Sequence, residues 1–307
     1  MQLESGKFSG HQSFTLRNTW LTKGVTECAR NPHVFRDDDS LLVLGVGKNM
    51  VEAIRYWGLA SQVVREKPEE RGACAPTDLG KRLFLGDSAW DPYLEDVASL
   101  WLIHWLVATN WAYATTIYYA FSELTGTFTR HGLEASIAEL AGGLGARATD
   151  NSIRRDVSVF IRTYVGGSER ASASVEDLLD GPLAELGLLY EVQGEQTYAF
   201  SRGPKDSLPD AVFLYALCDY AEQQQGQRSF TFDELAYGAM APGRVFKLDE
   251  LALAERLERM EGLTAGAIQF TETAGYRQVI TGREVDKYAA LDDYYGREAR
   301  GGDDGRV

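Results

Sequence analysis

The sequence predicts a mainly α fold with a winged helix-turn-helix N-terminal domain, a central helical domain and a winged-helix-like C-terminal part. Three observations favour it. Two glycines, Gly45 and Gly47, break an apolar segment just before an amphipathic helix. Helices followed by short strands of alternating polarity recur along the chain. A helical stretch rich in Trp and Tyr is apolar on nearly all sides. With 307 residues, 44% of them hydrophobic, the chain is long enough for two or three domains.

The first domain is expected over residues 1–88, with an N-terminal arm ahead of its first helix. A helix is predicted at 19–30, and a second begins at Lys48 after the glycine turn. Its apolar face carries Met50, Ile54 and Trp57, and its polar residues, which include Arg55, are expected to point outward. Residues 62–75 are expected to form a two-stranded wing, and 77–84 a short closing segment. An ordinary small helical subdomain is the alternative.

The glycine turn is suited to binding phosphate, because a helix N-terminus attracts anions and Lys48 adds a full positive charge. A nucleotide-binding loop is excluded by spacing. A P-loop needs Ser or Thr where Asn49 stands and glycine where Leu42 stands, and a dinucleotide motif needs glycine at Met50. A DNA backbone is therefore the expected phosphate ligand.

The central domain is expected over residues 89–166, with a long helix opening at residue 89. Asp91 and Glu95 are spaced to share a helix face, and with Asp96 they could hold a divalent ion, although helix capping explains them equally well. A second helix-turn-helix-like pair spans 133–164. Its second helix carries Arg154 and Arg155, which could contact phosphates or simply form an exposed charged face.

Charge divides the chain into two unlike halves. Residues 1–166 hold 17 Lys and Arg against 19 Asp and Glu, whereas residues 167–307 hold 14 against 26. A nucleic-acid surface is therefore expected only in the first half, because the acidic half would be repelled by a duplex. Residues 167–295 are expected to form an acidic helical and winged-helix-like domain, with a linker at 166–168, a helix at 175–186 and a disordered tail at 296–307.

Composition also excludes several classes of protein. No apolar run reaches the length of a membrane span, and the N-terminus lacks a secretion signal. The three cysteines are too far apart for a disulfide framework or a CxxC metal site, so a cytoplasmic protein is expected. Among the four histidines, His11 has glycine beside it in the arm, which would let it approach a phosphate, whereas a structural hydrogen bond is the commoner role.

Four motifs, in order, resemble one family. They are FSGHQSF at 8–14, LGVGKNMV at 44–51, TDLG at 77–80 and DPYLED at 91–96. The chain resembles the SspB-type proteins of single-strand DNA phosphorothioation systems, which implies bacterial antiphage defence and a DNA nickase that assists insertion of sulfur into the backbone. The residues that match the family's motifs are His11, Arg17, Gly47, Lys48, Asn49, Arg55, Glu95 and Asp96.

The leading hypothesis is a DNA-binding nicking endonuclease. Asp91, Glu95 and Asp96 would hold Mg²⁺ or Mn²⁺, and His11 would act as general base or phosphate ligand, with Glu95 and Asp96 also counted as catalytic. The residues expected to bind double-stranded DNA are Arg17, Lys48, Asn49, Arg55, Lys81, Arg82, Arg154 and Arg155.

The alternative is a non-catalytic DNA-binding adaptor that recruits sulfur-transfer and cysteine desulfurase proteins through its acidic half. It is supported by the absence of a recognised nuclease motif from the sequence. A transcriptional regulator is a third hypothesis. A homodimer is possible under each of them.

Overall fold

The computed structural model describes residues 6–165, 181–192 and 196–301. Two compact units divide the chain, Met1–Ser201 and Arg202–Val307, and each is described by itself. The domain boundaries expected at residues 88 and 166 both fall inside the first unit. Within the described ranges the chain is mainly helical with three small antiparallel sheets, and none of these helices combines the length and apolar character needed to cross a bilayer.

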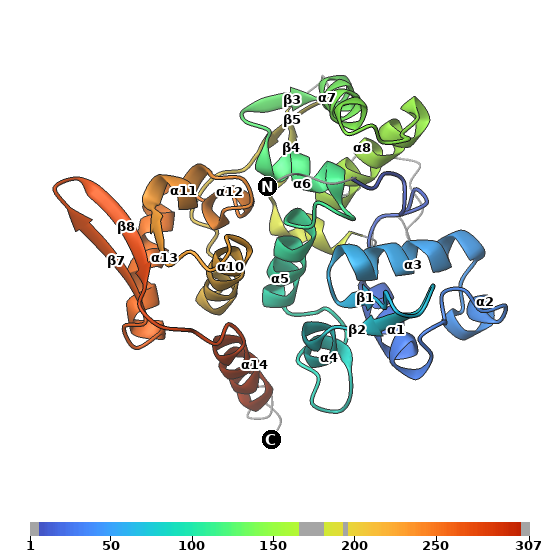
Figure 1. Ribbon diagram of the computed structural model, residues 1–307, viewed down its shortest axis with the longest axis horizontal. Coiled ribbons are helices and arrows are strands. Elements are labelled where there is room, and N and C mark those ends of the chain that lie inside the picture. Colours follow the sequence, from blue (N-terminus) through green and yellow to red (C-terminus); the bar gives the residue numbers. More distant parts are fainter. Residues whose placement is uncertain (1–5, 166–180, 193–195, 302–307) are drawn as a thin grey trace. The chain divides into compact units, whose positions relative to one another are not determined.

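The first unit begins with helices followed by a hairpin (Figure 1). Their bounds are α1 Asn18–Arg30, α2 Ser40–Leu44, α3 Lys48–Ala60, β1 Val64–Glu66, β2 Cys74–Pro76 and α4 Asp78–Phe84. The two strands pair antiparallel, at the position of the predicted wing. The apolar face predicted for α3 is confirmed at Ile54 and Trp57, which are fully buried, whereas Met50 is only partly buried. Gly45 ends α2 in the left-handed conformation, at φ 66°, which glycine adopts without strain.

Close backbone packing fixes the start of α4. The Thr77 side chain accepts a hydrogen bond from Gly80 N at 3.0 Å and so caps the helix. A Cβ atom on Gly80 would lie 2.1 Å from the carbonyl oxygen of Val63. Only glycine therefore lets this helix approach the strand region so closely.

The prediction of one long helix opening at residue 89 was wrong. The chain forms two helices, α5 Val97–Ala108 and α6 Thr115–Ser122. Asn110 lies in the interruption, where its side-chain nitrogen donates to the carbonyls of Leu59 and Ala60 at 3.0 and 2.9 Å, the last residues of α3. The expectation of a buried central element is confirmed, because α5 is buried on all sides from Ala98 to Ala108.

The rest of the first unit combines helices with a three-stranded sheet. Its elements are β3 Thr127–Thr129, α7 Arg130–Gly143, α8 Asp150–Val165, the 3₁₀ helix η1 Pro182–Leu186, β4 Leu189–Val192 and β5 Thr197–Phe200. The sheet order is β3-β5-β4, so β3, which lies much earlier in the chain, joins the hairpin of β4 and β5. The linker expected at 166–168 and the first half of the helix expected at 175–186 lie outside the described residues. Of the second half, Pro182–Leu186 is a 3₁₀ helix.

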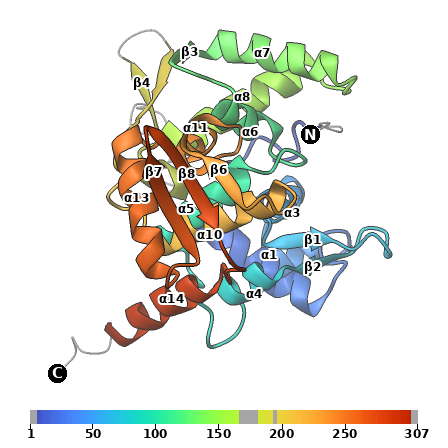
Figure 2. The same ribbon diagram turned by 60° about the vertical axis from the view of Figure 1, so that its left-hand side comes forward.

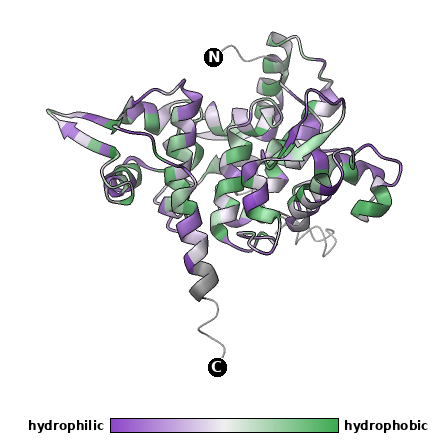
Figure 3. Ribbon diagram, turned by 60° about the horizontal axis from the view of Figure 1, so that its bottom comes forward, coloured by the Kyte–Doolittle hydropathy of each residue, from purple (hydrophilic) through white to green (hydrophobic). Residues whose placement is uncertain are grey.

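The second unit repeats this order of elements. They are α10 Asp210–Gln223, β6 Ser229–Thr231, α11 Phe232–Tyr237, α12 Pro242–Val245, α13 Glu250–Leu263, β7 Ile268–Thr273, β8 Tyr276–Thr281 and α14 Ala289–Gly301. The sheet order is β6-β8-β7, and Figure 2 shows β7 and β8 as a long hairpin. The helix α14 mixes hydrophilic and hydrophobic residues (Figure 3) and runs on past Gly296, into the segment expected to be disordered.

Candidate functional site

A strained loop at residues 9–13 lies between α3 and α8. Ser9, Gln12 and Ser13 have φ values of 64°, 51° and 75°, a region that non-glycine residues adopt only at a cost. Two hydrogen bonds to α8 hold the loop. Ser9 N donates to Asp156 Oδ1 at 2.7 Å, and Arg162 Nη2 donates to the Ser13 carbonyl at 2.6 Å. Strain of this kind, held by specific contacts, is a feature of functional sites.

His11 at the centre of the loop is buried against Asp156. Its Nε2 lies 2.8 Å from Asp156 Oδ1, and the two side chains are only 4% and 5% exposed. His11 Nδ1 accepts a hydrogen bond from Ser13 N at 3.2 Å, so the proton of the neutral ring is on Nε2, facing the carboxylate. The expectation of an extended arm free to approach phosphate is therefore corrected. Residues 9–13 form turns, and the His11 side chain points inward.

Tyr56 of α3 completes this cluster. Its ring meets the His11 ring edge-on, with 5.2 Å between the centroids. A Cβ atom on Gly10 would lie 2.5 Å from the Tyr56 ring, which explains the glycine before His11. Burial, with a further contribution from the Asp156 charge, holds the pKa of Tyr56 far above its usual value of 10, so the phenol is neutral at physiological pH.

A cavity of about 10 Å³ adjoins the buried pair and is lined by Tyr56, Thr116 and Asp156 among others. This volume is about that of a single water molecule. The hydroxyl of Thr116 is buried and, within the described part of the chain, has no hydrogen-bond partner. The cluster is thus polar, closed and large enough for one water beside the carboxylate.

The three carboxylates predicted to bind metal lie in the loop before α5. Because Asp91 and Glu95 are not on a helix, they do not share the predicted face. Both oxygens of buried Asp91 accept backbone N–H groups, from Glu95 and Asp96, at 3.0 Å each. Asp96 caps α5 by accepting from Ala98 N at 2.8 Å. The capping explanation is confirmed for Asp96. No group of three His, Cys, Asp or Glu side chains within the described ranges could hold a metal ion.

The predicted cations around α3 differ in their surroundings. Lys48 and Asn49 are exposed in its first turn, as expected. Arg55 instead forms an ion pair with Glu66 of β1, and its side chain is only 20% exposed. Its guanidinium group therefore supports the hairpin, which corrects the expectation that it points outward.

Three further predicted cations contact neighbours in their own segment. The Arg17 guanidinium lies 5.3 Å from the Trp20 ring, and that of Arg82 lies 5.6 Å from the ring of Trp90. Lys81 Nζ lies 3.1 Å from Asp78. Exposed Lys81 and Arg82 remain at the surface, and Arg17 is half-buried.

The helix α8 joins an exposed pair of cations to the buried cluster. Arg154 and Arg155 are exposed in its first half, and Asp156 follows directly on the buried side. Arg162 is exposed but turns toward the N-terminal loop through its bond to Ser13. A phosphate held at the two arginines would thus lie on the same helix that holds His11.

Comparison with known proteins gives a family. The family model described as a protein of unknown function, DUF4007, matches residues 8–295. A magnesium ion-bound SspB crystal structure has a TM-score of 0.85 and 31% identity, covering 96% of this chain and 89% of that one. A second SspB crystal structure gives 0.84 with the same identity and coverage. The chain belongs to the SspB family. Among curated proteins no match is found.

Sequence reasoning found one half of the buried pair in this SspB-family chain. It singled out His11 but missed Asp156 and Tyr56. A signal for Asp156 exists, because it falls on the apolar stripe of α8 formed by Ile153, Val157 and Phe160. A carboxylate on such a stripe needs a buried partner, and His11 supplies it.

Proposed function

We propose that this SspB-family chain is a DNA-nicking component of a DNA phosphorothioation defence system. The observation that carries the proposal is the similarity to SspB over 96% of the chain at a TM-score of 0.85. With 31% sequence identity, the two proteins are similar in sequence as well as in the arrangement of their helices. The proposal adds DNA as the substrate and hydrolysis of one phosphodiester bond as the reaction.

The proposed DNA surface lies on the first unit, on α3 and α8. Lys48 and Asn49 at the start of α3, and Arg154 and Arg155 on α8, are exposed. Helices followed by a hairpin are the order of a winged helix, and the sheet order β3-β5-β4 supports this for the segment containing α8. In such a fold a helix ahead of the hairpin contacts the major groove. Within the described residues α3 directly precedes the β1–β2 hairpin, whereas η1 lies between α8 and β4.

The proposed chemistry centres on His11. Asp156 fixes the ring orientation and keeps the proton on Nε2, so Nδ1 is the nitrogen that can accept a proton once the loop releases Ser13 N. The water oxygen would bond to phosphorus as the bond to the leaving oxygen breaks. The water proton would pass to Nδ1, and the leaving oxygen would take a proton from solvent.

Mg²⁺ is the proposed ion, with Mn²⁺ as the substitute, because a related SspB structure holds magnesium. Asp91 and Asp96 do not fit it in this conformation, and exposed Glu95 alone would supply a single carboxylate. Both oxygens of Asp91 and one oxygen of Asp96 are bound to backbone N–H groups. No ligand is therefore assigned to these three residues, and no step is derived through a metal.

Relaxation of supercoiled plasmid tests this proposal. The parent protein should convert plasmid to the open-circular form with Mg²⁺ and not with a chelator. His11→Ala should slow nicking by about 10²-fold or more. His131→Ala is the matched control, since His131 is 95% exposed on α7, and should nick like the parent. Equal nicking by both variants would rule out His11 as the base.

A second function, the DNA-binding adaptor, is favoured by the engagement of the predicted metal ligands in backbone hydrogen bonds. In that case the protein would bind DNA without cutting it and would recruit sulfur-transfer and cysteine desulfurase proteins. Calorimetry of the full chain with each purified partner tests this. Binding without any plasmid relaxation would favour the adaptor over the nickase.

A further inference from the structure

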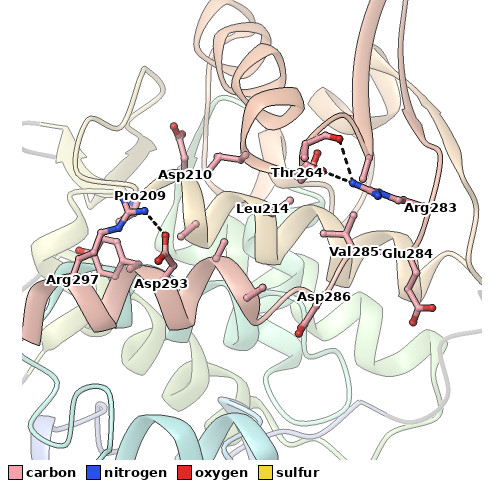
Figure 4. A pocket seen from close by; sticks show the side chains of 17 residues that line it. Pro209, Asp210, Leu214, Thr264, Arg283, Glu284, Val285, Asp286, Asp293 and Arg297 are labelled. Atoms are coloured by element: carbon pink, nitrogen blue, oxygen red, sulfur yellow. Dashed lines mark hydrogen bonds and ion pairs between the residues drawn. The ribbon is translucent and has the colours of Figure 1, made fainter.

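An open cleft of about 990 Å³ lies in the second unit, away from the proposed DNA surface residues in sequence. It is bounded by the start of α10, the end of α13, the segment between β8 and α14, and α14 itself (Figure 4). Its volume is at the upper end of the range for clefts that hold ligands. All of its lining residues belong to this one unit.

Apolar side chains form much of the cleft. Leu214 of α10 is buried in its floor, and Val285 lines the segment before α14. Leu263, the last residue of α13, is 48% exposed at the rim. On the side of α14 that lines the cleft, Ala289 and Ala290 have small side chains. An occupant with apolar side chains would therefore gain by removing this surface from water.

The carboxylates that line the cleft differ in their ion pairing. Asp210 pairs with Arg256 at 2.8 Å and with Arg259, and Asp293 pairs with Arg297. Glu284 and Asp286 are exposed at the rim. No ion pair to either carboxylate occurs in the part of the chain that the structure describes.

The positive groups of the cleft are already engaged inside the unit. Arg283 Nη2 lies 3.4 and 3.3 Å from the carbonyl oxygens of Thr264 and Ala265, beyond the end of α13 (Figure 4 draws Arg283 beside Thr264). The carbonyl end of a helix carries partial negative charge, which Arg283 offsets. Glu284, and the oxygen of Asp286 that does not accept from Tyr288 N, therefore remain available to an incoming ligand.

We propose that this cleft docks a basic amphipathic segment of a partner protein. Its apolar side chains would lie against Leu214, Leu263 and Val285, and its Lys or Arg side chains against Glu284 and Asp286.

Charge excludes the other occupants of this cleft. The rim carboxylates would repel DNA phosphates. Residues 302–307 of this chain contain two acidic residues, Asp303 and Asp304, and only one arginine, so their net charge is also negative. A second copy of the chain carries a net charge of −14.

Peptide binding to the full chain tests the proposal by fluorescence polarisation. The probe is a labelled helical peptide with Leu on one face and Lys on the other. Two control peptides replace Lys by Glu or Leu by Ser. The Leu/Lys peptide should bind, and each control should bind at least about tenfold more weakly, because the cleft requires both features.

A pair of double variants locates the site. Leu263→Ser with Glu284→Lys changes the rim of the cleft, and Leu251→Ser with Glu258→Lys is the matched control at exposed positions of α13 outside it. The first should weaken Leu/Lys binding at least about tenfold and the second less than about twofold. Thermal melting checks that both remain folded, which their exposure favours.

Three results would overturn the proposal. The first is an equal loss of Leu/Lys peptide binding in both double variants. The second is equally tight binding of the control peptide in which Ser replaces Leu. The third is displacement of the Leu/Lys peptide by double-stranded DNA, with stronger displacement from the variant that carries Leu263→Ser and Glu284→Lys. None of these readouts depends on plasmid nicking, so the docking site and the nickase can fail separately.

Discussion

His11 Nε2 lies 2.8 Å from Asp156 Oδ1, which joins the N-terminal loop to α8. The same helix exposes Arg154 and Arg155, two residues and one residue before Asp156. Because α8 both presents cations and holds the buried histidine, the proposed contact with DNA would be linked directly to the loop. The relationship makes α8 the element on which the proposed function depends most.

Removing Asp156 should destabilise the protein strongly. Asp156→Ala leaves His11 and the Ser9 amide without their buried acceptor, and we expect a loss of about 3 kcal/mol in the free energy of unfolding. Urea denaturation measures it. In a double-mutant cycle with His11→Ala, the loss in the double variant should differ from the sum of the two single losses by about 1–3 kcal/mol. Additive losses would mean that the two side chains are energetically independent.

Two glycine substitutions should have opposite effects. Gly80→Ala places a Cβ atom 2.1 Å from the Val63 carbonyl oxygen, so we expect a loss of about 2 kcal/mol or more as the backbone shifts. Gly142→Ala in α7 meets nothing within 4 Å and should be neutral or stabilising by up to about 1 kcal/mol. Thermal melting of the two variants side by side gives the comparison. A stable Gly80→Ala would contradict the tight approach of α4.

The cysteines should react slowly in the folded protein. Burial, with a smaller effect of Cys74, raises the pKa of Cys28 to about 12, and burial raises that of Cys218 to about 12. At pH 8 the thiolate fraction is then about 10⁻⁴, so iodoacetamide should label these sites about 10³-fold more slowly than in urea. Because pH 8 is below the raised pKa, each unit of pH increase should speed labelling about tenfold. Mass spectrometry follows each site, and fast labelling of Cys28 would mean that the α1 region opens readily.

DNA binding should depend on salt through α8. Replacing Arg154 and Arg155 together by Gln should weaken binding to all sequences alike and reduce the steepness of log K against log salt by about 2. Arg228→Gln is the control, because Arg228 is an exposed cation of the second unit. Fluorescence polarisation at several salt concentrations gives both slopes. A change for Arg228→Gln as large as that for the α8 pair would argue against the proposed surface.

Local chemistry explains which elements the sequence could predict. The glycine turn before Lys48 and the apolar face of α3 are properties of neighbouring residues, and both were predicted correctly. The β7–β8 hairpin has the same local character, because alternating residues flank the turn at Ala274 and Gly275. The start of α5 was not, since Asp91 binds the backbone amides of Glu95 and Asp96 and so replaces a helical turn with a loop.

Long-range contacts account for the rest. β3 has only three residues and acquires its identity from pairing with β5, which no local pattern reveals. The candidate site was half predicted for the same reason, since His11 is conspicuous beside Gly10 whereas Asp156 gains its meaning only when α8 meets the loop. Arg55 likewise resembles a surface cation until the hairpin brings Glu66 to it.

The loop at residues 9–13 also has a consequence for biosynthesis. Ser9 and its acceptor Asp156 are separated by 147 positions, and a ribosome adds about 5–20 residues per second. For about 7–30 s the emerging chain therefore contains the loop without the carboxylate that holds its left-handed residues in place. The loop thus leaves the ribosome well before α8 and is among the last parts of its unit to reach a final conformation.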